Sequence, residues 1–587
     1  MSTVQVTING QEIKCPSDAT VLEAARLAGF EIPTLCYLKE INEIGACRIC
    51  MVEVKGARTL VTACVYPVSD GMVVSTNTQK VRTARKMTLE LILSNHRKDC
   101  LTCLRNQNCE LQKLAIEFGV DRIRFADDNL KPQIERSTPS IVRDNSKCVL
   151  CRRCTAVCKE KQDVAVIGPK ERGFETNIGS PFDRNLGEMS CALCGQCTTA
   201  CPTGAVTEVD DTAKVYEALA DETKYVVVAP APSVRVALGE CFGMPIGTNV
   251  EGKMAAALRR LGFNEVFDVN FTADLTIMEE GTELIGRIKE GKNLPIITSC
   301  SPGWINYCEQ NYPEFLPNLS SCKSPQQMYG ALMKAYYAKK INVDPKDLFV
   351  VSVMPCTAKK GEMLRPHQQA VPGIYDIDVV LTTRELGRMI SNSGLIFQDL
   401  PDEDFDSPFG ISTGAGYIFG ASGGVMEAAL RTVVEVVTEK KMENIDLVEL
   451  RGITGLKEQE YDVAGIKVKV AVVSGLKNAG KLLEQVKAGE ADYHAIEVMA
   501  CPGGCIGGGG QPIQSGYTMS FNNVRELRTS AIYQGEVDKK PVRKSHENPV
   551  VQELYKAIGE PGGDTAHKWL HTYYKERTKY PGLEAEK

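Results

Sequence analysis

The sequence predicts a multidomain protein in which α+β modules precede one large α/β domain. Its 587 residues exceed a single domain of about 150 residues several-fold, so roughly four domains are expected. Most of the 23 cysteines lie before residue 202 in regularly spaced groups, whereas from Tyr225 onward apolar strand-like runs alternate with amphipathic helices. The expected divisions of the chain are 1–78, 79–125, 138–209, 222–520 and 521–587.

Composition and charge exclude several classes of protein. The net charge is −6 and the pI about 5.8, so no basic field attracts nucleic acid. The N-terminus lacks the basic and apolar regions of a signal sequence, and no run of 18 or more apolar residues predicts a membrane span. We expect a cytoplasmic protein without a membrane anchor.

The cysteines indicate metal ligation rather than disulfide bonds. Disulfide frameworks are typical of short secreted chains, and this chain is long and has no export signal. Four cysteines fall outside the spaced groups, and we expect them to be small buried hydrophobic residues: Cys15, Cys241, Cys308 and Cys322.

Residues 1–78 begin with the signal for a β-hairpin. Alternating apolar residues in Val4–Ile8 lead into an Asn9-Gly10 turn, and Ser17-Asp18 precedes a helical run. Four thiols follow, two close together and one further away on each side, which is an arrangement that suits a [2Fe–2S] cluster. They are Cys36, Cys47, Cys50 and Cys64. Zinc is the alternative, since four thiolates also bind Zn²⁺. The hairpin and helix favour a β-grasp ferredoxin module.

Residues 79–125 are predicted to be helical around Met87–Leu93 and then to present three closely spaced thiols, Cys100, Cys103 and Cys109. His96 lies four residues before the first of them. A lone histidine is usually structural, but this spacing favours its imidazole as the fourth ligand of a [4Fe–4S] cluster. Because imidazole is neutral, the site should have a higher reduction potential than a cluster held by four thiolates.

Residues 138–209 contain an internal repeat of a cysteine run. In two-cluster bacterial ferredoxins the fourth cysteine of each run ligates the other cluster. One [4Fe–4S] cluster is therefore expected on Cys148, Cys151, Cys154 and Cys201, and a second on Cys191, Cys194, Cys197 and Cys158.

Three loops in residues 222–520 carry four further thiols. Cys300 and Cys356 each follow a strand-like run, and Cys501 and Cys505 lie in the glycine-rich stretch 497–510. Loops after the strands of an open α/β sheet gather at one edge, and four thiolates are the ligand set of a cubane cluster. A flexible glycine loop or a phosphate-binding loop is the alternative, although no Gly-Lys-Ser/Thr follows.

The three loops resemble the signature segments of the [FeFe]-hydrogenases, here 298–304, 354–362 and 497–510. With the accessory ligand groups, the resemblance covers essentially the whole chain and indicates the clostridial type. It implies reversible reduction of protons to H₂ at an H-cluster, a cubane bridged through a cysteine sulfur to a two-iron unit with CO, cyanide and dithiolate ligands. The accessory clusters implied are one [2Fe–2S] and three [4Fe–4S], the His96 site being similar to one in respiratory complex I.

The resemblance also implies roles for other residues. Cys505 would bridge to the two-iron unit, and Lys359 would donate to a cyanide whose charge offsets the buried ammonium. The residues implied to surround the two-iron unit are Pro232, Ser233, Met354 and Met499. Those implied to carry protons are Glu280, Glu283 and Ser320, with Arg287 near the mouth of the path. For the glutamates, a solvated helix face is the alternative.

One position departs from the family pattern. Family members have two adjacent cysteines in the first loop, one a cluster ligand and the other the last proton carrier, whereas this chain has Cys300-Ser301. Because a cubane ligand is ordinarily a thiolate, ligand chemistry assigns Cys300 to the cluster and Ser301 to the proton path. Alignment by position gives the reverse assignment, which stays open.

Partners and alternative functions follow from the same features. A long series of clusters with a peripheral [2Fe–2S] module predicts ferredoxin, or partner subunits with flavin and NAD(P) sites, docking near residues 1–80. A complex I-like electron-input subunit would account only for the first 209 residues. A hydrogen sensor or an iron–sulfur assembly factor would keep the cubane thiols and lack the two-iron unit; the acidic residues, Lys359 and the methionines favour the enzyme.

Overall fold

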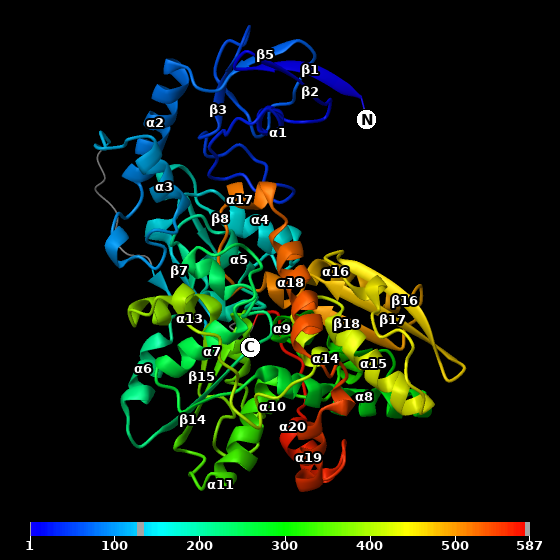
Figure 1. The fold of residues 1–587 in the computed structure, drawn as a ribbon. Coiled ribbons are helices and arrows are strands. Elements are labelled where there is room, and N and C mark those ends of the chain that lie inside the picture. Colours follow the sequence, from blue (N-terminus) through cyan, green and yellow to red (C-terminus); the bar gives the residue numbers. More distant parts are fainter. Residues whose placement is uncertain (1, 126–133, 581–587) are drawn as a thin grey trace.

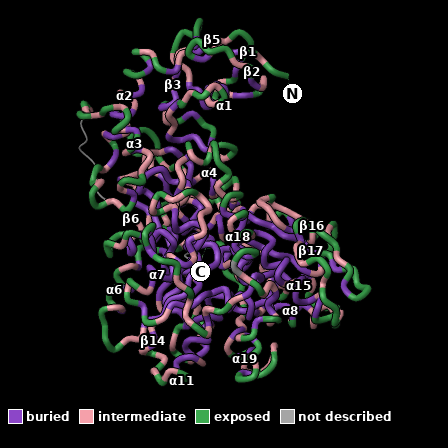
Figure 2. Tube along the Cα trace, in the orientation of Figure 1, coloured by how far each residue is buried: buried purple, intermediate pink, exposed green. Residues whose placement is uncertain are grey.

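The computed structural model describes residues 2–125 and 134–580. The N-terminal module lies at one end of the molecule, and the accessory cysteine modules connect it to the large domain (Figure 1). Buried residues are concentrated inside the large domain, whereas exposed segments border much of the N-terminal module (Figure 2). Among the described residues, no helix combines the length and apolar character needed to cross a membrane.

The N-terminal module is a five-stranded sheet in the order β2-β1-β5-β3-β4, packed against one helix. Asn9 and Gly10 both have positive φ in the predicted hairpin turn, as a two-residue turn requires. The helix cap predicted at Ser17-Asp18 is wrong, because Thr20 and Glu23 form a reciprocal capping box. The elements are β1 (Thr3–Ile8), β2 (Gln11–Pro16), α1 (Val21–Leu27), β3 (Met51–Val54), β4 (Val61–Thr62) and β5 (Met72–Ser75).

The next two modules are small and organised around their cysteines. The His96 module consists of α2 (Gln79–Ser94), η1 (Cys100–Thr102) and α3 (Glu110–Glu117). In the module that follows, each cysteine run leads into a helix, so the sequence repeat becomes the packed pair α4 (Arg153–Glu160) and α5 (Gln196–Ala200). The strands of this module are β6 (Ile134–Glu135), β7 (Ile141–Asp144), β8 (Gly168–Lys170), β9 (Asn177–Gly179) and β10 (Val206–Glu208).

The large domain contains two four-stranded sheets rather than one. The first, in the order β12-β11-β14-β15, is fully parallel: β11 (Tyr225–Pro230), β12 (Glu265–Val266), β14 (Leu348–Met354) and β15 (Val379–Thr382). The second, in the order β13-β18-β17-β16, has only β16 antiparallel: β13 (Ile296–Ile297), β16 (Leu456–Val463), β17 (Ile466–Ser474) and β18 (Ala495–Met499). The predicted α/β alternation is confirmed.

Helices cover these sheets and carry several of the predicted site residues. The longest, α8 (Val269–Glu290), is buried along its first half. The others used below are α9 (Pro302–Asn311), α10 (Pro325–Leu332), α12 (Ala358–Glu362) and α15 (Gly424–Thr438). The remaining longer helices are α6 (Thr212–Ala220), α7 (Glu251–Arg260), α13 (Thr383–Asn392) and α16 (Leu476–Lys487).

The C-terminal segment lies against the large domain. Its helices are α17 (Gly516–Phe521), α18 (Val524–Lys539), α19 (Pro549–Ile558) and α20 (Asp564–Leu570). α19 contacts α8, and α20 contacts α10. α20 ends at Leu570, and His571 pairs with Cys322 in a β-bridge.

Three of the four cysteines outside the predicted ligand groups are buried as expected, namely Cys15, Cys308 and Cys322. The expectation for Cys241 is wrong, because this residue is exposed. It lies at the end of a short 3₁₀ helix, Leu238–Phe242, beside Gly387 of α13.

Candidate active site

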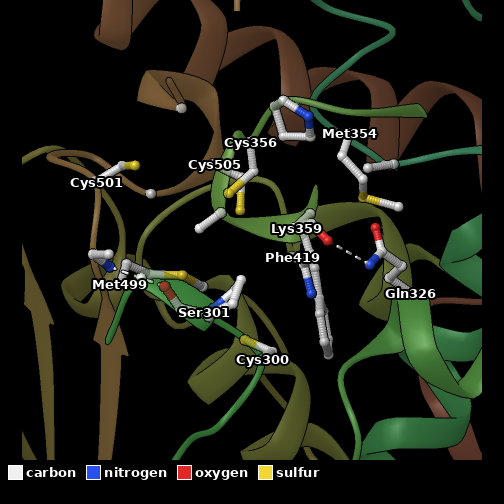
Figure 3. Close-up of a pocket in the computed structure, with 18 of the residues that line it drawn as sticks. Cys300, Ser301, Gln326, Met354, Cys356, Lys359, Phe419, Met499, Cys501 and Cys505 are labelled. Carbon is white, nitrogen blue, oxygen red and sulfur yellow. Dashed lines mark hydrogen bonds between the residues drawn. The ribbon is translucent and has the colours of Figure 1, made fainter. Parts of the chain in front are cut away.

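A cavity of about 80 Å³ lies where the three thiol-bearing loops meet (Figure 3). The loops follow the C-terminal ends of β13, β14 and β18, which brings together segments of both sheets of the large domain. All four predicted cubane thiols line the cavity, namely Cys300, Cys356, Cys501 and Cys505. The arrangement matches the expectation that loops after strands build a site at the carboxyl edge.

Three of these thiols influence one another directly. Burial raises the pKa of Cys501, and the charges of Cys356 and Cys505 raise it further. Burial likewise raises the pKa of Cys505 to about 12, with Cys356 adding to the shift. Thiols of raised pKa stay protonated near neutral pH unless a metal replaces the proton, so this group is suited to a bound cationic cluster.

Glycines allow the loop after Cys505 to pack closely against its surroundings. A Cβ on Gly508 would lie 2.1 Å from the Pro355 carbonyl oxygen, and one on Gly509 would lie 2.4 Å from the Cys194 carbonyl oxygen. Any larger residue would push the loop away from both neighbouring segments. The glycine-rich stretch therefore closes the cavity by backbone contact and is not a free linker.

Cys300 and Ser301 occupy different parts of the cavity wall. The Cys300 side chain is set apart from the other three thiols (Figure 3). Its pKa is raised first by burial and then by the carboxylate of Glu280, which belongs to the predicted proton path. Ser301 precedes α9, and its Oγ accepts a hydrogen bond of 3.2 Å from the Ala500 amide beside Cys501. Both residues line the cavity, and the charge of Cys505 also raises the pKa of Cys300.

Most residues expected around the two-iron unit line the same cavity. Pro232, Met354 and Met499 do so, whereas Ser233 does not. Ser233 is fully buried nearby, and its Oγ has no hydrogen-bond partner among the described residues. The cavity wall also includes Gln326 and Phe419, which sequence analysis missed because neither belongs to a recognisable motif.

Lys359 lies at the cavity, and its ammonium is already paired. Its Nζ is 2.8 Å from Oε2 of Glu362 on the same short helix, α12. Burial raises the pKa of Cys356 and Cys505, and the Lys359 charge opposes both shifts. The side chain therefore supplies positive charge to the thiols while Glu362 holds it in place.

The predicted proton carriers form a continuous chain along α8. Arg287 contacts Glu283 at 2.6 Å, and Ser320 Oγ donates to Glu283 at 3.0 Å. Burial raises the pKa of Glu280 to about 7, an effect that a hydrogen bond from Ser320 partly opposes. The charge of Glu280 also raises the pKa of Cys300, which lines the cavity. Glu280 is buried, so the solvated-face alternative does not apply to it.

The structure also brings together the thiols predicted for the N-terminal module. The Sγ atoms of Cys50 and Cys64 are 3.3 Å apart. Cys36 and Cys47 form a second close pair, and the Cys36 pKa is lowered to about 7 by a hydrogen bond from Cys47. Charge interactions between the two pairs place all four thiols in one group.

His96 is buried and uncharged near neutral pH. Burial lowers its pKa to about 4, and its Nδ1 has no partner among the described residues. A neutral imidazole with a free nitrogen is the form that binds metals. Burial raises the pKa of Cys109 and the charge of Cys103 adds to the shift, while Cys103 Sγ lies against Gly204.

The cysteines of the repeat separate into the two predicted groups. A small cavity of about 20 Å³ is lined by the first group, Cys148, Cys151, Cys154 and Cys201. In the second group, Cys197 interacts with Cys191 and Cys158. Cys194 interacts with Cys197 and Cys191, and also with Cys501 of the large domain, whose cavity it lines. The second group thus borders the candidate active site.

Residues 224–509 match the family described as iron only hydrogenase large subunit, C-terminal domain. A relative described as NADP-reducing hydrogenase subunit HndD, from Solidesulfovibrio fructosivorans, is 46% identical over 99% of this chain and 100% of its own length. The chain belongs to the iron-only hydrogenase family. Iron hydrogenase 1 of Clostridium pasteurianum is 41% identical to this hydrogenase over 97% of the chain and 100% of its own length.

Other parts of this hydrogenase match families of their own. They are a 2Fe-2S iron-sulfur cluster binding domain (1–79), an NADH-ubiquinone oxidoreductase-G iron-sulfur binding region (85–124), a 4Fe-4S dicluster domain (147–205) and an iron hydrogenase small subunit (522–577). The solved structure of a variant of apo [FeFe]-hydrogenase HydA1 from Chlamydomonas reinhardtii has a TM-score of 0.55 and 42% identity, covering 62% of this chain and 99% of that one.

The residues present fit the cluster that the family carries. Four thiols line one cavity, a glycine loop closes it, and Lys359 offers positive charge beside it. The unpaired Ser233 hydroxyl is a further polar group available nearby.

Proposed function

We propose that this hydrogenase interconverts protons and H₂ at an H-cluster held by Cys356, Cys501 and Cys505. The observation that carries the proposal is the convergence of these thiols on a cavity that Cys194 of the accessory module also lines. When bound, the cluster supplies the redox chemistry and the iron site at which H₂ forms or splits. Cys505 is the proposed bridge to its two-iron unit, with Met354, Met499, Pro232 and Ser233 around it.

The proposed accessory clusters are one [2Fe–2S] and three [4Fe–4S]. Their ligands are Cys36, Cys47, Cys50 and Cys64; His96, Cys100, Cys103 and Cys109; Cys148, Cys151, Cys154 and Cys201; and Cys158, Cys191, Cys194 and Cys197. Electrons would pass between the N-terminal clusters and the active site through the group containing Cys194, because its thiol interacts with Cys501. The comparison with a 4Fe-4S dicluster domain supports the last two sites.

Protons would enter near Arg287 and travel along Glu283, Ser320, Glu280 and then Cys300. A proton carrier works best when its pKa lies near the working pH, and burial raises the pKa of Glu280 to about 7. We assign Cys300 to the last step because its side chain is set apart from the other three thiols (Figure 3) and the charge of Glu280 raises its pKa. Ser301 Oγ would then supply the fourth corner of the cubane, an oxygen donor in place of a thiolate.

An infrared spectrum and an iron analysis test the catalytic assignment. Protein produced together with the maturation enzymes of the family is expected to show iron-bound CO and cyanide bands, and to hold about 20 iron atoms when fully loaded. His96→Ala and Cys148→Ala should each lower the iron content. Absence of the bands would leave a role in cluster assembly or in sensing. An assembly role has a similar protein in the cytosolic Fe-S cluster assembly factor narfl of Xenopus tropicalis, which is 34% identical over 55% of this chain and 70% of its own length.

Partner subunits are expected to connect this chain to flavin and NAD(P) chemistry. Two findings support them, the similarity to an NADP-reducing hydrogenase subunit over the full length and the match of 85–124 to a complex I region. The isolated chain, loaded with its clusters, should evolve H₂ with an artificial reductant and fail with NADH or NADPH. Direct turnover of the isolated chain with either nucleotide would contradict this prediction, and ferredoxin-driven turnover would identify ferredoxin as sufficient.

A further inference from the structure

A second hydrogen-bonded chain lies beside the proposed proton path and involves the C-terminal segment. His571 follows α20 and uses both ring nitrogens: Nδ1 is 2.8 Å from Ser321 Oγ, and Nε2 is 3.0 Å from Oε2 of Glu279. The histidine side chain is 7% exposed and the glutamate side chain 0%. Neither contact is part of the path from Arg287 to Cys300.

The surroundings of Glu279 fix which nitrogen of His571 carries a proton. The carboxylate accepts hydrogen bonds from the Tyr555 hydroxyl at 2.6 Å and from the Gly562 amide at 2.8 Å. With donors on both oxygens, the carboxylate is suited to the ionised form, which only accepts hydrogen bonds. Nε2 of His571 must then donate. Nδ1 and the Ser321 hydroxyl share the other hydrogen bond.

Ser321 connects this chain to the proton path. Its backbone amide donates to both carboxylate oxygens of Glu283, at 3.3 and 3.1 Å, next to the bond from Ser320 Oγ. Two backbone hydrogen bonds join the Ser320–Ser321 turn to the C-terminal segment. The Thr572 amide donates to the Ser321 carbonyl, and the Lys323 amide donates to the Leu570 carbonyl. Ser321 is thus one of the groups that hold Glu283, together with Ser320 and Arg287.

We propose that His571 is a positioning residue for proton transfer: through Ser321 it holds the Ser320–Ser321 turn against Glu283, and so couples the C-terminal segment to the path. The inference rests on the proposed role of Glu283. His571 touches neither the cavity nor any predicted cluster ligand, so its effect on turnover is indirect. His571 lies within residues 522–577, which match the iron hydrogenase small subunit.

Two substitutions test the two hydrogen bonds of His571 separately. The amide of an asparagine reaches the position of Nδ1 and keeps the Ser321 contact, whereas the amide of a glutamine reaches the position of Nε2 and keeps the Glu279 contact. His571→Gln is expected to lower turnover about tenfold, the effect of one hydrogen bond on a rate-determining geometry. His571→Asn should stay within about twofold of the unchanged enzyme while melting at a lower temperature, because Glu279 loses a donor.

Amide hydrogen exchange supplies a readout that is independent of activity. In His571→Gln and in Ser321→Ala, the peptide covering 320–323 should exchange faster, because the turn is no longer fixed. The infrared bands of the loaded enzyme should not change in either variant. Unchanged turnover in His571→Gln would overturn the proposal, as would an equal loss in His571→Asn. Glu283→Gln, measured in parallel, distinguishes failure of this inference from failure of the proposed proton path. If Glu283→Gln retains turnover, the proposed path itself is wrong.

Discussion

Replacing Glu283 by glutamine is expected to lower H₂ turnover about 100-fold or more while leaving the clusters intact. The amide keeps the size of the side chain, and its oxygen in the position of Oε2 still accepts hydrogen bonds from Ser320 and Ser321, whereas the ion pair with Arg287 is lost. It cannot take up and release a proton, so the chain between Arg287 and Glu280 is interrupted. Turnover with an artificial reductant and the infrared spectrum, measured on the same preparation, check both halves of the expectation.

Glu290→Gln is the matched control for this substitution. It makes the same chemical change on the same helix, at an exposed position near the C-terminal end of α8. Its turnover should equal that of the unchanged enzyme. If Glu283→Gln also turns over normally, protons reach the active site by another route, and the roles proposed for Glu280 and Ser320 lose their support.

Replacing Cys300 by alanine is expected to abolish most turnover and to leave the iron content and the infrared bands unchanged. The Cys300 side chain lies apart from the other three thiols (Figure 3), and the charge of Glu280 on the proposed proton path raises the pKa of its thiol. A thiol that serves as the last proton carrier contributes about 100-fold or more to the rate. Iron analysis and infrared spectroscopy distinguish this outcome from loss of a ligand.

Ser301 provides the complementary measurement. Ser301→Cys would supply a fourth thiolate and should keep the cubane, with a changed electron paramagnetic resonance signal and a changed reduction potential. Ser301→Ala should weaken cubane binding. If Cys300→Ala instead loses the cubane while Ser301→Ala retains it, ligand chemistry was the better guide, and Cys300 is the fourth ligand.

Much of the accessory architecture could be predicted because its signals are local. The spacing of Cys148, Cys151 and Cys154 alone predicts that they share a site, and the structure groups them on one cavity. The Asn9-Gly10 turn likewise specifies its hairpin within two residues. In such cases, the chain brings the groups together over short distances, and little tertiary information is needed.

Contacts between distant segments could not be predicted in this way. Gln326 reaches the cavity because α10 packs near α12, and no motif near Gln326 indicates that packing. The pairing of Lys359 with Glu362 was missed because the expected partner was a cyanide of the cluster. The division of the large domain's strands into two sheets could not be predicted from the sequence either, because each strand has the same apolar character whichever sheet it joins.

The contact between the accessory module and the glycine loop limits how far this enzyme can be shortened. A Cβ on Gly195 would lie 2.3 Å from Thr357 Oγ1, and one on Gly509 would lie 2.6 Å from the Gly195 Cα. The solved HydA1 chain, which covers only 62% of this one, has no counterpart for the remainder. In the intact chain, the glycine-rich surface of the large domain packs against the accessory module. Removing residues 1–209 would expose this surface to water. A minimal version of the large domain would need this contact surface redesigned.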